Sequence, residues 1–373
     1  MQCDYFDAGR CRSCTLMGVP YGAQLAEKQR RAAEVLGAHV PGRAWSDPVR
    51  SPESHYRNKA KLVVGGTVGR PTLGILDERG RGVDLRRCGL YEPGLAATFD
   101  PLARVVADLR IEPYDVPARR GELKYVIVTH SPDGEQLVRF VVRSEAGADL
   151  VTDALPDVRE ALPSARVVTV NLHPEHKAVL EGETERVLTA QEHLPMRLPG
   201  ATLLLGPRSF FQTNTTVAVA MYEQARDWAD ALDPRTVRDL YCGVGGFALH
   251  LAGDGRRVLG VESSPEAVAA AEASRDGAPG EVRFVVGDAT AAVLGEDPPD
   301  LVVVNPPRRG IGPELAAALE GSSAAHLLYS SCNLESLARD LDLLPSWRVS
   351  QGRVADLFPQ TRHVETLLLL DRA

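Results

Sequence analysis

The chain has 373 residues, 44% of them hydrophobic, which is enough to bury a large core and predicts two domains more readily than one. No apolar run approaches the roughly 20 residues of a membrane span, and the first residues resemble no targeting peptide, so we expect a soluble cytoplasmic protein without a membrane partner. The net charge of -8 at first argues against a nucleic-acid partner, but the charge is unevenly distributed. Residues 1–124 hold 20 Lys and Arg against 15 Asp and Glu, whereas residues 201–373 hold 15 against 23. The N-terminal part could therefore still offer a basic surface to a phosphate backbone.

Four of the six cysteines lie in this more basic part, at Cys3, Cys11, Cys14 and Cys88. Six cysteines are too few for a disulfide scaffold in a chain of this length. Three thiols within twelve residues would invite oxidation if they had no ligand. Four thiolates suit either a tetrahedral zinc ion or an iron-sulfur cluster, and the spacing alone does not choose between them.

Residues 1–200 are typical of an α+β domain with a mostly antiparallel sheet and few helices, one of them around 24–36. Alternating runs such as "KLVVGGTVG", "KYVIVTH" and "QLVRFVVR" predict the strands. Basic side chains accompany these runs in "YRNKAK" and "RRGELK", where cations on alternate positions form either a solvated face or contacts to phosphates. We predict RNA contacts for Arg57, Lys59, Lys61, Arg119, Arg120 and Lys124.

The Pro- and Gly-rich stretch "LPMRLPGATLLLGP" (194–207) predicts the domain boundary, with one domain at 1–200 and the other at 201–373. The second domain opens with a helix at 215–232, for which Asn214 is the expected N-cap and Asp233-Pro234 the stop. Apolar runs then alternate with Ala-rich helical stretches, which predicts a doubly wound, Rossmann-like parallel sheet. The expected strands lie at 237–242, 256–262, 282–288, 300–307 and 326–332, with 365–370 closing the set.

A cofactor site is predicted where the first of these strands runs into the glycine turn "DLYCGVGGF". Glycines there, at Gly243 and Gly245, let a backbone approach a ligand closely at a helix start. Glu262 ends the second strand and suits two ribose hydroxyls, while Asp288 ends the third and Asn305 follows the fourth. A nicotinamide dinucleotide would favour G-x-G-x-x-G, so this combination looks instead like an S-adenosyl-L-methionine-dependent methyltransferase.

A reactive group is predicted at Cys332, in "HLLYSSCN" at the end of the fifth strand. Asn305-Pro306-Pro307 alone suggests methylation of an amino group, but Arg308 and Arg309 follow where such enzymes usually carry an aromatic residue. A thiolate that adds to carbon 6 of uracil makes carbon 5 nucleophilic toward a sulfonium methyl group. A base must then remove the proton from carbon 5, and Glu365 is the candidate because it opens the final strand.

The motifs "SFFQTN", "DLYCGVGGF", "NPPRRGIG", "YSSCN" and "HVETLLLL" together resemble the RNA uracil-C5 methyltransferase family, and "MQCDYFDAGRCRSC" is similar to its branch acting on 23S ribosomal RNA. The resemblance implies that Cys332 is the nucleophile and Glu365 the base. It implies a 4Fe-4S cluster on the four N-terminal cysteines and 23S rRNA as the partner. We expect a monomer. The resemblance also implies that Gln212, Tyr241, Glu262 and Asn305 contact the methyl donor or the target. Arg308 lies beside the predicted pocket, so we predict an RNA contact for it as well.

Three alternatives stay open at this point. A transfer-RNA uracil-C5 methyltransferase would use the same chemistry, although the N-terminal cysteine set disfavours it. An amino-methyltransferase built on N-P-P would need no cysteine nucleophile. A non-catalytic iron-sulfur RNA-binding protein would have lost the donor and thiol motifs, which are intact here.

Overall fold

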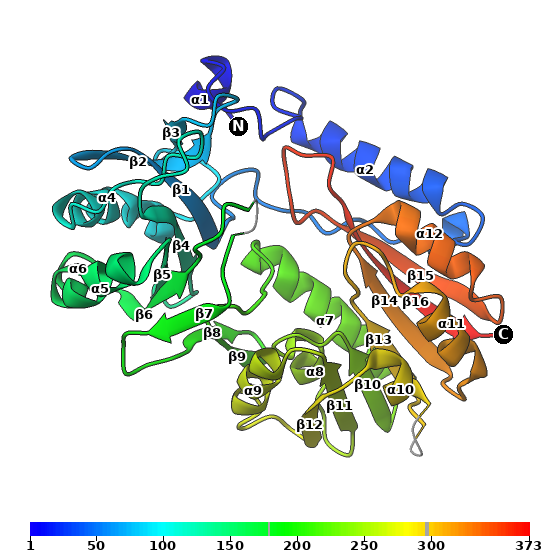
Figure 1. Cartoon of the computed structure of the whole chain (residues 1–373). Coiled ribbons are helices and arrows are strands. Elements are labelled where there is room, and N and C mark those ends of the chain that lie inside the picture. Colours follow the sequence, from blue (N-terminus) through cyan, green and yellow to red (C-terminus); the bar gives the residue numbers. More distant parts are fainter. Residues whose placement is uncertain (178–179, 295–297) are drawn as a thin grey trace. The chain divides into compact units, whose positions relative to one another are not determined.

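The computed structural model describes residues 1–177, 180–294 and 298–373, and the chain forms two compact units (Figure 1). The first unit joins Met1–Cys14 to Ser54–Met196, and the second joins Thr15–Glu53 to Arg197–Ala373. The boundary expected at residue 200 does not anticipate that residues 15–53 group with the second unit. They do so because apolar side chains of this segment, such as Ala32 and Leu36, are fully buried in its core.

The first unit is built on a seven-stranded sheet in the order β3-β2-β1-β4-β5-β6-β7. Every neighbouring pair is antiparallel except β5 with β6, so the sheet is mostly antiparallel, as predicted. The parallel pair needs a crossover, which α5 and α6 supply. The strands are β1 (Lys59–Thr67), β2 (Arg70–Leu76), β3 (Gly82–Asp84), β4 (Leu123–His130), β5 (Gln136–Val142), β6 (Ala165–Leu172) and β7 (Thr184–Val187).

Helices cover one face of this sheet more extensively than the sequence suggested. Apolar residues of β1, β4 and β5, among them Leu62, Val126 and Phe140, pack with Phe99 and Leu102 into one buried cluster. The sequence does not predict these helices because most are short, and a few turns are too short a stretch to show the helical spacing of apolar residues. Those of this unit are α1 (Asp4–Asp7), α3 (Pro93–Ala97), α4 (Phe99–Asp108), α5 (Glu145–Asp153) and α6 (Leu155–Ala161).

The second unit contains a seven-stranded sheet in the order β12-β11-β10-β13-β14-β16-β15 (Figure 1). The first five of these are parallel, as predicted from their continuous apolar runs. A separate pair, β8 (Leu194–Leu198) and β9 (Ala201–Leu205), spans the junction at 196–197. The strands of the large sheet are β10 (Thr236–Leu240), β11 (Arg257–Glu262), β12 (Glu281–Val286), β13 (Leu301–Val304), β14 (His326–Ser331), β15 (Trp347–Ala355) and β16 (Glu365–Arg372).

The expectation of a wholly parallel sheet is wrong for its last two strands. β16 runs antiparallel to β14, and β15 runs antiparallel to β16. A central strand buried on both faces shows the same apolar run in either direction, so the sequence does not reveal the orientation of β16. β15 was not predicted, because its polar and apolar residues alternate as on an edge strand. The sheet is therefore mixed.

The helices of the second unit include one from the N-terminal part of the chain, α2, which packs against α12 and β15 (Figure 1). Asn214 caps α7 by accepting a hydrogen bond from the Val217 amide, and Asp233 ends it in the left-handed conformation, both as predicted. Within the described residues, no helix has the length and apolar character needed to cross a bilayer. The helices are α2 (Tyr21–Val35), η1 (Gly42–Ala44), α7 (Thr215–Leu232), α8 (Gly246–His250), α9 (Pro265–Ser274), α10 (Ala289–Val293), α11 (Gly312–Gly321) and α12 (Leu334–Asp342).

The strand order reverses between β10 and β13. From β10 the chain builds outward through β11 and β12, and it then returns to place β13 and β14 on the other side. In open α/β sheets, ligands bind at such a reversal, outside the carboxyl ends of the strands. The turn after β10 and Asn305 after β13 both lie there.

Candidate active site

A pocket lies at the reversal of strand order and brings together residues from four parts of the second unit. Four of the predicted cofactor residues line it: Gln212, Tyr241, Gly243 and Asn305. Gly245, Glu262 and Asp288 do not. Residues not predicted as cofactor contacts complete the lining: Phe210, Phe211, Tyr222, Cys242, Val244, Gly246 and Phe247. Phe210 is 70% exposed.

The turn after β10 is held in a conformation that depends on its sequence. Gly243 and Gly245 have φ of 55° and 86°, which L side chains rarely adopt. A Cβ atom on Gly245 would also lie 2.8 Å from Cζ of Phe284. Tyr241 adopts φ of 61° without being glycine, and such backbone strain clusters at functional sites.

Two acidic side chains lie at or just after the ends of neighbouring strands at this edge of the sheet, and one of them, Glu262, holds the turn. At the end of β11, Glu262 accepts a hydrogen bond through Oε2 from the Gly243 amide at 3.2 Å. Its Oε1 accepts from the Ser263 and Ser264 amides at 2.7 and 3.0 Å. Asp288 follows β12 and caps α10 by accepting from the Ala291 amide at 3.0 Å. Both carboxylates therefore stand at the ligand edge of the sheet although they do not line the pocket.

Asp239 in β10 is a buried carboxyl group beside the same turn. It is 1% exposed, and its Oδ2 accepts a hydrogen bond from the Ala248 amide at 2.8 Å. Its Oδ1 finds no hydrogen-bond partner among the described residues. Burial raises the pKa of Asp239 to about 7, with the charge of Glu262 adding to the effect. A cationic ligand group at this place would compensate the burial.

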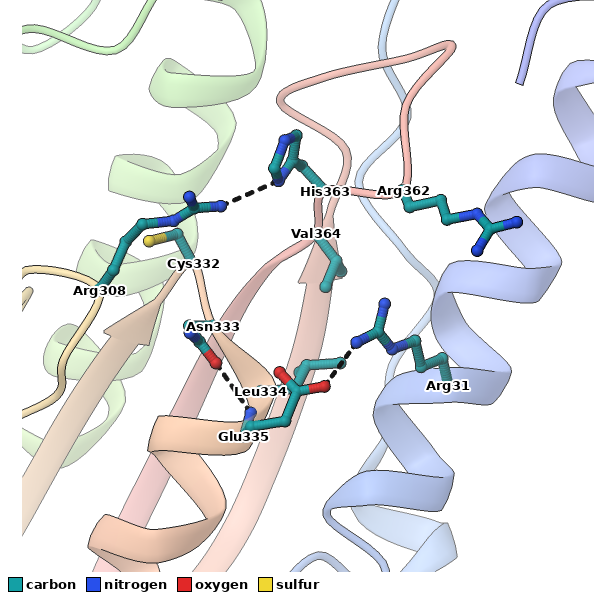
Figure 2. Close-up of a pocket in the computed structure, with 9 residues that line it drawn as sticks. All are labelled: Arg31, Arg308, Cys332, Asn333, Leu334, Glu335, Arg362, His363 and Val364. Atoms are coloured by element: carbon teal, nitrogen blue, oxygen red, sulfur yellow. Dashed lines mark hydrogen bonds and ion pairs between the residues drawn. The ribbon is translucent and has the colours of Figure 1, made fainter. Parts of the chain in front are cut away.

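A second pocket of about 240 Å³ surrounds Cys332, which follows β14 and is half-buried (Figure 2). Arg308 extends across the sulfur, and its guanidinium reaches His363, with Nη2 and Nδ1 3.1 Å apart. On the opposite side, Arg31 of α2 pairs with Glu335. The sequence had singled out only Cys332 and Arg308 here. The full lining is Arg31, Arg308, Cys332, Asn333, Leu334, Glu335, Arg362, His363 and Val364.

The surroundings of Cys332 raise its pKa, and one nearby cation, Arg308, reduces this upward shift. Burial is the largest cause, and the negative charge of Glu365 acts in the same direction. Arg308 lowers the pKa through its charge and through a hydrogen bond to the thiol. Arg308 is therefore the group that stabilises the thiolate, which is the nucleophilic form of cysteine.

Glu365 opens β16 on the face of the sheet that also carries Cys332. The antiparallel ladder between β14 and β16 ends at the pair Ser331 and Thr366, each next in the chain to one of the two residues, and the charge of Glu365 acts on the Cys332 thiol. Ser330 Oγ donates to Glu365 Oε1 at 2.9 Å. Glu365 is 3% exposed, and this burial raises its pKa to about 7, a value suited to a general base at neutral pH.

The four N-terminal cysteines gather in the first unit although Cys88 is distant in the sequence. Burial raises the pKa of Cys14 to about 11, and the thiols of Cys88, Cys11 and Cys3 raise it further in that order. All four are unpaired thiols. Across the described ranges, however, no three Cys, His, Asp or Glu side chains take up positions that would hold a metal ion. The donor chemistry suits a cluster of thiolates, whereas a closed ligand geometry is not formed.

The six cations predicted to meet RNA in the first unit differ in exposure. Lys124 is buried; its ammonium donates to the Glu175 carbonyl at 2.6 Å and lies 4.7 Å from the centroid of the Tyr114 ring. Burial lowers the pKa of Lys59 to about 8. The charge of Arg57 lowers the pKa values of Cys14 and Cys88, so this arginine lies beside the cysteines. Lys61, Arg119 and Arg120 are exposed, and Arg57 and Lys59 are half-buried.

An open α/β sheet with a glycine turn at the strand-order reversal and a carboxylate on the next strand defines the class of S-adenosylmethionine-dependent methyltransferases. In agreement, a sequence model described as "Methyltransferase domain" matches residues 237–320, and one described as "tRNA (Uracil-5-)-methyltransferase" matches residues 294–373.

Relatives extend the match over the whole chain. The 23S rRNA (uracil(747)-C(5))-methyltransferase RlmC of Salmonella newport (strain SL254) is 43% identical over 376 aligned positions, which cover 100% of both chains. The RlmC protein of Salmonella typhi is 44% identical with the same coverage. The crystal structure of Pyrococcus abyssi tRNA (uracil-54, C5)-methyltransferase in complex with S-adenosyl-L-homocysteine superposes with a TM-score of 0.82 and 26% identity, covering 96% of this chain and 84% of that chain.

The chain belongs to the RNA uracil-C5 methyltransferase family and is an S-adenosylmethionine-dependent enzyme. The resemblance recognised in the sequence motifs is confirmed by relatives of this similarity along the full chain.

Proposed function

We propose that the protein methylates carbon 5 of a uridine in 23S rRNA, at the position that corresponds to uracil 747 in the name of its RlmC relatives. The observation that carries this proposal is the end of the β14–β16 ladder, where the charges of buried Glu365 and of Arg308 both act on the Cys332 thiol. Neither an amino-methyltransferase nor a binding module needs that arrangement.

The proposed reaction uses Cys332 as the nucleophile and Glu365 as the base. The Cys332 thiolate, stabilised by Arg308, adds to carbon 6 of the uracil and makes carbon 5 nucleophilic. Bound S-adenosylmethionine supplies the methyl group from a sulfonium, whose carbon-sulfur bond breaks as the bond to carbon 5 forms. Glu365 then accepts the proton of carbon 5, and the bond between Sγ and carbon 6 breaks to release the product.

The methyl donor is proposed to bind at the turn after β10. Gln212, Tyr241, Gly243 and Asn305 line that pocket, and Glu262 and Asp288 lie at the same edge of the sheet. Gly245 allows the turn to form.

The RNA must present an unstacked uridine, because a stacked base does not reach a thiol at the bottom of a pocket. Arg308 is the proposed contact nearest the reaction, and Lys61, Arg119 and Arg120 are the exposed cations of the first unit. Arg57 and Lys59 have partly exposed side chains that suit phosphates, whereas Lys124 is already engaged by Glu175. We propose that the protein acts as a monomer in the cytoplasm, where ribosomal RNA is found.

A second candidate substrate is transfer RNA, since the matching solved structure is that of a tRNA (uracil-54, C5)-methyltransferase. The chemistry would be the same. The full-length similarity to the RlmC proteins favours ribosomal RNA.

The proposed function is tested with RNA that contains 5-fluorouridine. Fluorine at carbon 5 blocks the final removal of a proton, so protein, RNA and S-adenosylmethionine should form an adduct that survives denaturation. The adduct is measured as a shifted band in a denaturing gel, and its mass should equal protein plus methylated RNA. If the protein formed the adduct with a tRNA but not with a 23S rRNA fragment, transfer RNA would be favoured as the substrate. If it formed no adduct with either RNA, uracil-C5 methylation would be contradicted.

We propose further that Cys3, Cys11, Cys14 and Cys88 hold a 4Fe-4S cluster. The gathering of four thiols and the resemblance of their spacing to the ribosomal branch of the family support this assignment. Methyl transfer moves no electrons to an external acceptor, so the cluster would act structurally or shape the RNA-binding surface.

Anaerobically purified protein should contain about four iron and four sulfide ions per chain and absorb broadly in the visible range. Cys88→Ser should lower the iron content and should leave donor binding unchanged, because Cys88 belongs to the first unit. Elemental analysis and absorbance provide the measurement. Colourless protein rich in zinc would show that the four thiols serve a different metal.

A further inference from the structure

The segment between β15 and β16, residues 356–364, carries part of the Cys332 pocket. Arg362, His363 and Val364 line the pocket, and Glu365 follows directly. The helix that secures this segment comes from far away in the sequence. α2 turns one face into the unit, with Tyr21, Gln24, Leu25, Lys28 and Ala32 buried.

Lys28 is a buried cation in this otherwise mainly apolar face. Its ammonium donates to Asp356 Oδ1 at 2.6 Å and to the Phe358 carbonyl at 3.0 Å. The two side chains of the ion pair are only 3% and 0% exposed. Replacing such a pair by apolar residues of similar volume is often neutral or stabilising, so its presence argues for a role in geometry more than in stability.

Gln24 makes a reciprocal contact one turn earlier on the helix. Its Nε2 donates to Gln360 Oε1, and its Oε1 accepts from the Gln360 amide, both at 2.9 Å. The Gln360 carbonyl in turn accepts from the Leu16 amide at 2.9 Å. Gln360 is buried with φ of 65°, a conformation that a side chain keeps only where its surroundings enforce it.

A continuous set of contacts leads from the Phe358 carbonyl to the nucleophile. This carbonyl also accepts a hydrogen bond from Thr361 Oγ1 at 2.8 Å, and Thr361 Oγ1 accepts one from the His363 amide at 3.2 Å. His363 Nδ1 lies 3.1 Å from Arg308 Nη2. Arg308 in turn interacts with the Cys332 thiol.

We propose that Lys28 and Gln24 are positioning residues for uracil-C5 methylation: they fix residues 356–364 so that His363 and Arg308 hold the Cys332 thiol in place. The inference rests on the proposed function and extends it by giving α2 a part in the reaction. Neither residue touches the reacting atoms. Their effect is on geometry, where a displacement of 1 Å can lower a rate about a hundredfold.

The test replaces the buried ion pair by an apolar pair, Lys28→Met with Asp356→Leu, so that no unpaired charge remains in the core. We expect the double variant to fold with unchanged affinity for S-adenosylmethionine. Its rate of adduct formation with 5-fluorouridine RNA at saturating RNA should fall about 10- to 100-fold, and kcat should fall while KM for RNA changes little. A purely structural role would change the melting temperature and leave the rate of the folded enzyme intact.

Arg30→Met is the matched control, since it removes a cation from the exposed side of the same helix, where Arg30 pairs with Glu27 and Glu34. It should form the adduct at the wild-type rate. If the double variant does not fold, Gln360→Gly decides, because glycine adopts the left-handed conformation freely, loses the side-chain hydrogen bond from Gln24 Nε2 and keeps only the backbone one, so residues 356–364 are held less firmly. An adduct rate within about twofold of wild type in either folded variant overturns the inference. Failure of the wild-type enzyme to form any adduct would instead refute the proposed function.

Discussion

Replacing Cys332 by alanine should abolish methylation while leaving donor binding intact. Without the thiolate, carbon 5 of the uracil is too weak a nucleophile, and loss of an enzymatic nucleophile can lower a rate by up to about 10⁶-fold. We expect a decrease on the order of 10⁴-fold or more. Methyl transfer from labelled S-adenosylmethionine to a 23S rRNA fragment measures it.

The same variant separates chemistry from folding. Cys332 is half-buried at the end of a strand, so a smaller side chain leaves little empty volume. Titration calorimetry should give an unchanged affinity for S-adenosylmethionine, because Cys332 does not line the donor pocket. No adduct should form with 5-fluorouridine RNA. Methylation at more than a small fraction of the wild-type rate would rule out the covalent route.

Glu365→Gln should stop the reaction after methyl transfer, with an expected decrease in turnover of about 10²- to 10⁴-fold. An amide does not accept the proton of carbon 5, so the bond between Cys332 and the ring persists. We therefore expect the variant to accumulate a methylated adduct with ordinary uridine RNA, which the wild type releases. Mass spectrometry of the denatured complex detects it.

The pH dependence of the wild type follows from the same carboxyl group. Its pKa is raised to about 7 by burial, and only the ionised form is a base, so turnover should be low below pH 6 and rise through about pH 7. The hydrogen bond from Ser330 lowers this pKa, so Ser330→Ala should move the rise to higher pH. A profile unaffected by this change would assign the base to another residue.

The sequence predicts the parallel strands of the second unit well, because their local pattern of apolar residues matches the burial of those residues. The strands β10 to β14 lie within two or three residues of their expected positions, because a buried parallel strand is a nearly continuous apolar run. Since such strands end at one edge of the sheet, the strand pattern alone suffices to place Tyr241, Gly243 and Asn305 together. The polar contacts of Glu262 and Asp288 do not follow from spacing.

What the sequence does not reveal are contacts between distant segments. Nothing local in α2 shows that Gln24 and Lys28 are buried, since polar residues on a helix are normally solvated. His363 and Arg31 were missed for the same reason, because they reach the Cys332 pocket only through tertiary packing. The direction of β16 depends on its neighbours and not on its own residues.

The discontinuity of the second unit bears on how the protein acquires its structure. Residues 15–53 pack with residues 197–373, so the intervening segment Ser54–Met196 forms a long loop that must close before the core around Ala32 and Leu36 is complete. Contacts of such high sequence separation slow folding, because the entropy of loop closure is lost before the contacts form. The pairing of Lys28 with Asp356 joins residues separated by most of the polypeptide. We therefore expect the reaction centre, assembled from both ends of the chain, to be completed late in folding.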